Sequence, residues 1–177
     1  MATVRLLLGI IFFGFAGSAR LSHSHLLTLK EKLVLRAEQE VGVREKTGKN
    51  DGVRVETYLR SVGLKKGDKW CAAFISFLFA QEGLKKPKTG WTPDLFPKSR
   101  LSKSALPGNL LAIYFPELKR IAHVGLVTAR DGDYVLSIEG NTNVIGSREG
   151  DGVYRKRRHI KTIYQFSDWI TKEGGAP

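Results

Sequence analysis

The sequence contains one cysteine, Cys71, among 177 residues. A single cysteine excludes an intrachain disulfide, so this residue is either a buried structural side chain or a reactive thiol. Acidic side chains are also scarce, because 17 aspartates and glutamates stand against 29 lysines and arginines. The formal net charge at pH 7 is therefore +12.

This positive charge favours contact with anionic surfaces. The basic residues are dispersed along the chain and form no recognisable nucleic-acid-binding motif, so we expect no nucleic-acid partner. For an exported protein the expected partner is an anionic cell envelope or membrane. A surface that is charged only for solubility is the alternative.

The first 19 residues differ from the rest of the chain. An apolar run, Leu6 to Gly17, follows Arg5 and leads into the small residues Gly17-Ser18-Ala19. This pattern predicts a secretory signal peptide over residues 1–19. The run is shorter than the ~20 residues that a bilayer span needs, which disfavours the alternative of an uncleaved anchor. We therefore expect export to the periplasm, cell envelope or medium, with no stable membrane span after cleavage.

The remaining sequence predicts one domain over residues 26–170, between a flexible segment at 20–25 and a tail at 171–177. His23 and His25 lie in the flexible segment, without the further ligands that a metal site requires. Thr28 and Glu31 are spaced as a capping box that starts a first helix. A second helix is expected over residues 53–62, and a third over residues 71–80. The third is apolar on every side, which is typical of a helix buried in the middle of a domain.

The second half of the sequence consists of short β-type runs separated by Gly, Asp, Asn or Pro. These runs are residues 110–115, 124–129, 134–139, 153–158 and 162–166. Helices followed by an antiparallel sheet predict a single α+β domain.

Cys71 lies at the start of the predicted buried helix. With Asp68 as the N-cap, Cys71 would be the third helical residue. The free amides and positive dipole at a helix start favour an anion and lower the pKa of a thiol. The same amides could hold the oxyanion of an acyl-transfer reaction. The alternative is a structural cysteine in an apolar core.

A nucleophilic thiolate needs a base, and that base needs a partner to orient it. His123 is the best candidate base, because it directly precedes an apolar run and would lie at the end of a strand. Glu139 closes the next apolar run, which is an unusual position for a carboxylate unless it is paired. Asn141 follows two residues later, and both side chains would point to one face of an extended chain.

The hairpin that joins these two runs tests this assignment. A two-residue turn at 131–132 with unbroken pairing would put His123 and Glu139 on opposite faces of the sheet. A three-residue loop or one bulge would bring them to the same face, with His123 opposite either Asn141 or Glu139. We therefore predict an odd loop or a bulge in this hairpin.

Three segments carry a family resemblance: Trp70-Cys71-Ala72-Ala73-Phe74-Ile75-Ser76, Ala122-His123-Val124-Gly125 and Glu139-Gly140-Asn141-Thr142-Asn143. Together, in this order, they resemble the CHAP family of cysteine amidohydrolases and peptidases, part of the papain-like group that includes the NlpC-type cell-wall peptidases. The resemblance implies a papain-like fold and cleavage of peptidoglycan as an amidase or endopeptidase. It also implies Cys71 as nucleophile, His123 as general base and then acid, Glu139 as the orienting residue and Asn141 as a supporting polar residue.

Other expectations follow from departures from the family pattern and from nearby aromatic residues. Some family members carry an acidic calcium loop before the cysteine. Residues 65–69 hold one carboxylate among three lysines, so we expect no metal and no other cofactor. No wall-binding domain is expected to follow, and we expect a monomer.

Trp70, Trp91 and Phe96 are candidates for lining a substrate groove, with plain packing as the alternative.

Three other functions compete with this hypothesis. A transferase or a deamidating effector would use the same Cys–His pair, because a thioester can react with an amine as well as with water. A basic envelope-binding protein would need only a structural Cys71. A nucleic-acid binder is favoured by charge alone.

Overall fold

The computed structural model describes residues 28–145 and 149–171. The predicted signal peptide at 1–19 and the segment at 20–25 lie outside these residues, as does the tail after Thr171. The described residues form three α-helices and one six-stranded antiparallel sheet, so the α+β class is confirmed. Within them, no helix combines the length and the apolar character needed to span a membrane.

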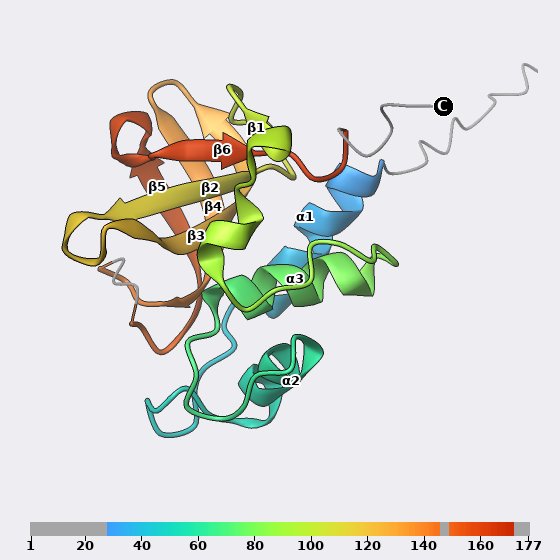
Figure 1. Cartoon of the computed structure of the whole chain (residues 1–177), viewed down its shortest axis with the longest axis vertical. Coiled ribbons are helices and arrows are strands. Elements are labelled where there is room, and N and C mark those ends of the chain that lie inside the picture. Colours follow the sequence, from blue (N-terminus) through green and yellow to red (C-terminus); the bar gives the residue numbers. More distant parts are fainter. Residues whose placement is uncertain (1–27, 146–148, 172–177) are drawn as a thin grey trace, which may run out of the picture.

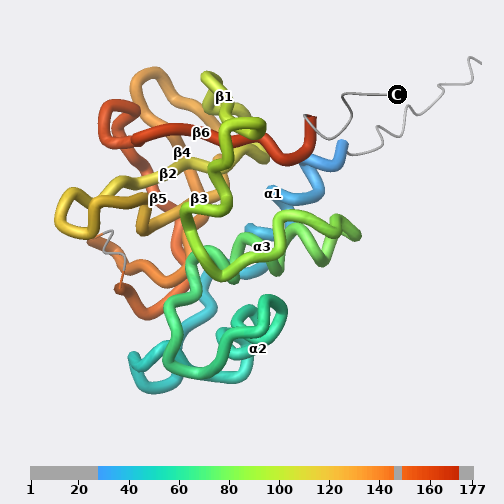
Figure 2. The backbone as a smooth tube through the Cα atoms, in the orientation of Figure 1, coloured from blue at the N-terminus to red at the C-terminus, as the bar shows by residue number. Residues whose placement is uncertain are grey.

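The first helix, α1 (Leu29–Glu40), begins as its sequence predicts. The Thr28 hydroxyl accepts a hydrogen bond from the Glu31 amide at 3.3 Å, and the Glu31 carboxylate accepts one from the Thr28 amide at 2.7 Å. This reciprocal pair is the expected capping box. Lys30 of α1 also contacts the far end of the chain, with Nζ 2.7 Å from Asp168 Oδ2. Figure 2 shows the start of α1 beside the end of the described chain.

The third helix, α3 (Cys71–Gln81), is the centre of the domain. Every residue from Cys71 to Phe79 is buried, as its apolar sequence predicts. It packs against α1, α2 (Val53–Ser61) and the sheet, and Figure 1 shows it between the sheet and α2. Each large apolar side chain buried in this way stabilises the fold by about 1.5–3 kcal/mol.

The sheet has the strand order β1-β6-β2-β3-β4-β5. Its strands are β1 (Leu101–Ser102), β2 (Leu110–Phe115), β3 (Arg120–Asp131), β4 (Tyr134–Thr142), β5 (Gly152–His159) and β6 (Gln165–Ser167). β2 has the predicted bounds, whereas β3 begins four residues earlier than expected. The predicted strand at 162–166 is wrong in its first half, because residues 160–162 form a turn of 3-10 helix before β6.

Both faces of the sheet are covered by apolar side chains. Leu110 of β2 belongs to the main core with α3, whereas its neighbour Leu111 belongs to a smaller cluster with Val127 and Val135. Since successive residues of a strand point to opposite faces, the two clusters lie on opposite sides of the sheet.

The β3–β4 hairpin contains the predicted irregularity. Asp131 pairs with Tyr134 across a two-residue turn, but the register shifts between Val127 and Ala129. Thr128 is therefore an extra residue, and the prediction of a bulge in this hairpin is confirmed. A second shift occurs between β3 and β2, where Ala122 is the extra residue beside His123.

Candidate active site

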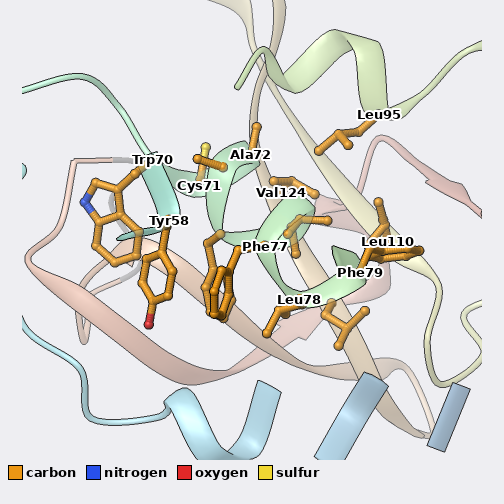
Figure 3. Close-up of a cluster of buried hydrophobic side chains, with 14 of the residues drawn as sticks. Tyr58, Trp70, Cys71, Ala72, Phe77, Leu78, Phe79, Leu95, Leu110 and Val124 are labelled. Carbon is orange, nitrogen blue, oxygen red and sulfur yellow. The ribbon is translucent and has the colours of Figure 1, made fainter. Parts of the chain in front are cut away.

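Cys71 is the first residue of α3, and Trp70 is the N-cap. The prediction that Asp68 caps this helix is wrong. The Asp68 carboxylate instead accepts a hydrogen bond from the Lys65 amide at 2.9 Å and closes a turn that ends before the helix. Cys71 is therefore the first helical residue and not the third, two positions earlier than expected, but it still lies among the amides that an α-helix leaves without intrahelical partners. Figure 3 shows Cys71 at the beginning of this helix, next to Trp70 and Ala72.

The thiol contacts two other segments. Its Sγ atom lies 3.5 Å from the hydroxyl oxygen of Thr92 and 4.0 Å from the carbonyl oxygen of Ala122. Thr92 begins a short 3-10 helix (Thr92–Leu95), and Ala122 is the bulged residue of β3. The bulge thus brings the backbone of β3 against the thiol, directly before His123.

His123 and Glu139 form a buried pair. Nε2 of His123 lies 2.7 Å from a carboxylate oxygen of Glu139, and at most 1% of either residue is exposed. The other ring nitrogen, Nδ1, is buried and has no hydrogen-bond partner among the described residues. Since Nε2 is occupied by Glu139, Nδ1 is the nitrogen that can exchange a proton with the thiol.

Glu139 is held from two further sides. Ser137 donates a hydrogen bond to one carboxylate oxygen at 2.7 Å. Arg158, from β5, binds both oxygens, with Nε and Nη2 at 2.6 and 2.5 Å. Gly125 provides the room for this carboxylate, because a Cβ atom there would lie 2.6 Å from Glu139 Cγ.

The electrostatics couple the thiol, the imidazole and the carboxylate. Burial opposes charge on all three groups, but their mutual interactions outweigh it. The nearby imidazole of His123, followed by the Thr92 hydroxyl, brings the pKa of Cys71 below its ordinary value. Cys71 and Glu139 raise the pKa of His123 to about 9, and Arg158 and His123 hold the pKa of Glu139 at about 2. These directions favour a thiolate paired with an imidazolium.

The thiol and the imidazole are both buried. Cys71 is 5% exposed, whereas His123 is 1% exposed. The polar neighbours of Sγ are the Thr92 hydroxyl and the Ala122 carbonyl, which belong to the segment after Trp91 and to the start of β3.

Asn141 lies near the site, but the hydrogen bonds of its side chain go to other residues than His123. Asn141 lies in β4, but its φ angle is +55° and the register against β5 shifts between Glu139 and Thr142, so the regular extended chain predicted from Glu139 to Asn141 is interrupted there. Its side-chain oxygen accepts a hydrogen bond from the Trp70 amide at 3.0 Å, and its nitrogen donates to Asn50 and Gly150. Asn141 therefore holds the residue before the nucleophile.

The predicted groove aromatics lie in different surroundings. Trp70 has no exposed surface, packs against Tyr58, and donates through Nε1 to Glu45 at 2.8 Å, so it cannot line a groove as predicted. Phe96 is also in the core, with 6% exposed. Trp91 is 50% exposed and directly precedes Thr92, so it remains a candidate for substrate contact.

Thr92, Ser137 and Arg158 belong to this site and were not predicted from the sequence, and for Thr92 and Arg158 the reason is clear. Thr92 follows Trp91 in a segment for which the sequence predicts neither a helix nor a strand. Arg158 lies in a basic run that indicates a solvated surface. Neither position carries a local signal, because each reaches the site through a contact between segments that are distant in sequence.

The described residues contain no group of three or more His, Cys, Asp or Glu side chains arranged to hold a metal ion.

Comparison with known proteins gives few matches. No family model matches the chain, and no curated protein matches it. Two solved structures of Ly7917 are similar to it, one of them "with the hydrolyzing product of MDP". Each is 15% identical to this chain and covers 78% of it, with a TM-score of 0.42. The match covers 61% and 62% of those two chains, so this chain spans about three fifths of their length.

Proposed function

We propose that this protein is an exported cysteine hydrolase of the CHAP family, with a papain-like fold, that cleaves amide bonds of peptidoglycan. The observation that carries this proposal is the buried His123–Glu139 pair, whose imidazole is electrostatically coupled to the Cys71 thiol at the start of α3. A thiol at a helix start, an imidazole with one free nitrogen and a buried carboxylate are the three parts of a cysteine-dependent acyl transfer.

The reaction would proceed in two steps. The Cys71 thiolate attacks the amide carbonyl, and the free amides at the start of α3 stabilise the negative oxygen. Nδ1–H of His123 then protonates the leaving amine as the carbon–nitrogen bond breaks, which leaves a thioester on Cys71. In the second step His123 removes a proton from water, the hydroxide attacks the thioester, and the carboxylic acid product leaves the regenerated thiolate.

Glu139 orients His123 during both steps. Its carboxylate holds Nε2–H at 2.7 Å, which directs Nδ1 toward the reacting atoms. Arg158 and Ser137 keep this carboxylate ionised and in place, so it orients the ring without taking its proton.

The choice of peptidoglycan has three supports. The three motifs resemble a family that mostly cuts peptidoglycan, the first 19 residues read as a secretory signal, and the net charge of +12 favours an anionic envelope. Cleavage of the amide between muramic acid and the stem peptide, and cleavage within the peptide, both fit this proposal.

Incubation with purified peptidoglycan, followed by mass spectrometry of the released fragments, tests the proposal. The wild-type protein should release new amino and carboxyl termini, and Cys71→Ala and His123→Ala should release none. Equal release by Cys71→Ala would mean that the cysteine is structural. Adding a primary amine tests the transferase alternative, because a transferase would yield the amine adduct in place of the free acid.

A further inference from the structure

A cation and an aromatic ring form a pair at the edge of the candidate active site. The guanidinium carbon of Arg120 lies 4.1 Å from the centre of the Trp91 ring. Trp91 is 50% exposed and Arg120 is partly exposed, so the pair faces solvent. Tryptophan is the most favourable ring for cation–π contacts in proteins, and arginine is the cation found there more often than lysine.

The two residues come from the two segments that touch the thiol. Trp91 directly precedes Thr92, whose hydroxyl is 3.5 Å from Sγ of Cys71. Arg120 lies two residues before Ala122, whose carbonyl is 4.0 Å from the same atom. Two residues of extended chain span at most about 7 Å, the length of about two substrate residues, so the pair lies within reach of the substrate residues that flank the scissile amide.

The backbone of Trp91 and the side chain of Arg120 are both held by contacts within the protein. The Trp91 amide donates to the Thr89 hydroxyl at 3.0 Å, and the Thr89 amide and carbonyl both bond to Ser76 Oγ of α3. Arg120 donates through Nη1 to the Ile121 carbonyl at 3.1 Å and lies against the indole. A guanidinium fixed in this way loses little side-chain entropy when it binds a ligand.

Arg120 has no carboxylate partner among the described residues, unlike six other described arginines. Arginines that are paired with a carboxylate are Arg36, Arg54, Arg60, Arg155, Arg157 and Arg158. The remaining N–H groups of Arg120 are therefore available to a ligand. Their planar geometry matches a carboxylate, which can accept two parallel hydrogen bonds.

We propose that Arg120, supported by Trp91, is a specificity residue that binds a free carboxylate on the substrate residue next to the scissile amide. This inference rests on the proposed function, because it assumes that Cys71 attacks an amide. It goes further by naming the substrate class: a peptide whose carboxyl group near the cleaved bond is ionised and not amidated.

Matched muropeptides that differ only in a free or an amidated stem-peptide carboxyl group test the proposal. Binding is measured by calorimetry on Cys71→Ala, which retains the site but cannot turn the peptides over. The free acid should bind about 10- to 100-fold more tightly than the amide, as expected for one hydrogen-bonded charge pair. When Arg120→Gln is added to the Cys71→Ala protein, the affinity for the free acid should fall to the affinity for the amide. The affinity for the amide itself should not change. Arg120→Lys, which keeps the charge but not the planar pair of donors, should recover part of the difference.

Arg130→Gln is the matched control, because Arg130 is an exposed arginine at the other end of β3. It should retain the full preference for the free acid. Equal binding of the two muropeptides, no binding of either, or an equal loss for both in Arg120→Gln would overturn the inference. Turnover by the unmodified enzyme is measured separately: if it cleaves neither peptide while Cys71→Ala discriminates between them, the proposed function fails and the carboxylate subsite stands.

Discussion

Arg158 binds both oxygens of the Glu139 carboxylate, the same carboxylate that holds His123. One buried negative charge therefore lies between two positively charged side chains. This arrangement explains how a carboxylate with no exposed surface stays ionised, since burial alone would raise its pKa. It also implies that the imidazole depends on a residue of the next strand, β5, which makes no direct hydrogen bond to it.

Arg158→Gln should lower the free energy of unfolding by about 3 kcal/mol at pH 7, because it leaves Glu139 with less compensation for its burial. The pKa of Glu139 is about 2 in the folded protein, against an ordinary value of 4.5. A lowered pKa contributes stability above pH 4.5 that is lost as the pH falls toward 2. The difference between wild type and variant should therefore shrink over this range in urea denaturation. A constant difference from pH 7 to pH 2 would contradict the assignment.

Glu139→Gln should move the alkaline limit of activity to lower pH. Activity requires the Cys71 thiolate together with the His123 imidazolium, so it falls as the pH rises through the pKa of His123, which is about 9. Glutamine can still accept a hydrogen bond but removes the negative charge that stabilises the imidazolium. The profile of kcat/KM between pH 5 and 10 measures the shift. An unchanged alkaline limit, with only a lower maximum, would mean that Glu139 acts through packing.

Thr92→Val should slow alkylation of Cys71 below neutral pH. The Thr92 hydroxyl bonds to Sγ and lowers the pKa of the thiol, and valine keeps the shape of threonine without the hydroxyl. Loss of one such bond should reduce the thiolate fraction, and so the rate with iodoacetamide at pH 6, by about 2- to 10-fold. Thr57→Val, on α2, is the control and should react like the wild type. A faster reaction in Thr92→Val would indicate that Thr92 mainly blocks access.

Gly125→Ala should displace the Glu139 carboxylate. The added Cβ would lie 2.6 Å from Glu139 Cγ, closer than such atoms can approach. We expect a loss of about 1–3 kcal/mol in unfolding free energy and a large fall in kcat, since His123 loses its orienting partner. Gly132→Asn provides the comparison, because Gly132 lies in the β3–β4 turn with open space around its Cβ position and asparagine tolerates its φ of +56°. Similar activity in both variants would contradict this role of Gly125.

Local patterns in the sequence were sufficient to predict much of the fold. The capping box at Thr28 and the apolar run of α3 depend on neighbours within a few residues, and both are present as expected. The bulge in the β3–β4 hairpin could also be predicted, because only an odd register lets His123 and Glu139 share a face. The first residue of α3 could not be predicted in this way, because the Trp70 amide is bound by Asn141, which lies 71 residues away in the sequence.

The same distinction applies to the site. Cys71, His123 and Glu139 stand out because each interrupts or borders an apolar segment. Thr92 and Arg158 do not, because their roles depend on how a 3-10 helix packs on β3 and how β5 pairs with β4. Arg158 lies opposite Val135 and reaches along the sheet to Glu139, a relationship that no pattern within residues 155–158 could reveal.

Because Thr128 is an extra residue in β3, the number of residues between His123 and Glu139 matters more for the pairing of this hairpin than the identity of residue 128. Deleting Thr128 would exchange the two faces of every preceding residue in β3 relative to β4, so that Val124 would occupy the side now held by His123. Many substitutions at Thr128 should be tolerated, whereas a one-residue insertion or deletion between His123 and Glu139 should not. An alignment of distant homologues that opens a single gap in this interval would therefore pair residues from opposite sides of the sheet, and a length-preserving alignment is the safer guide to this site.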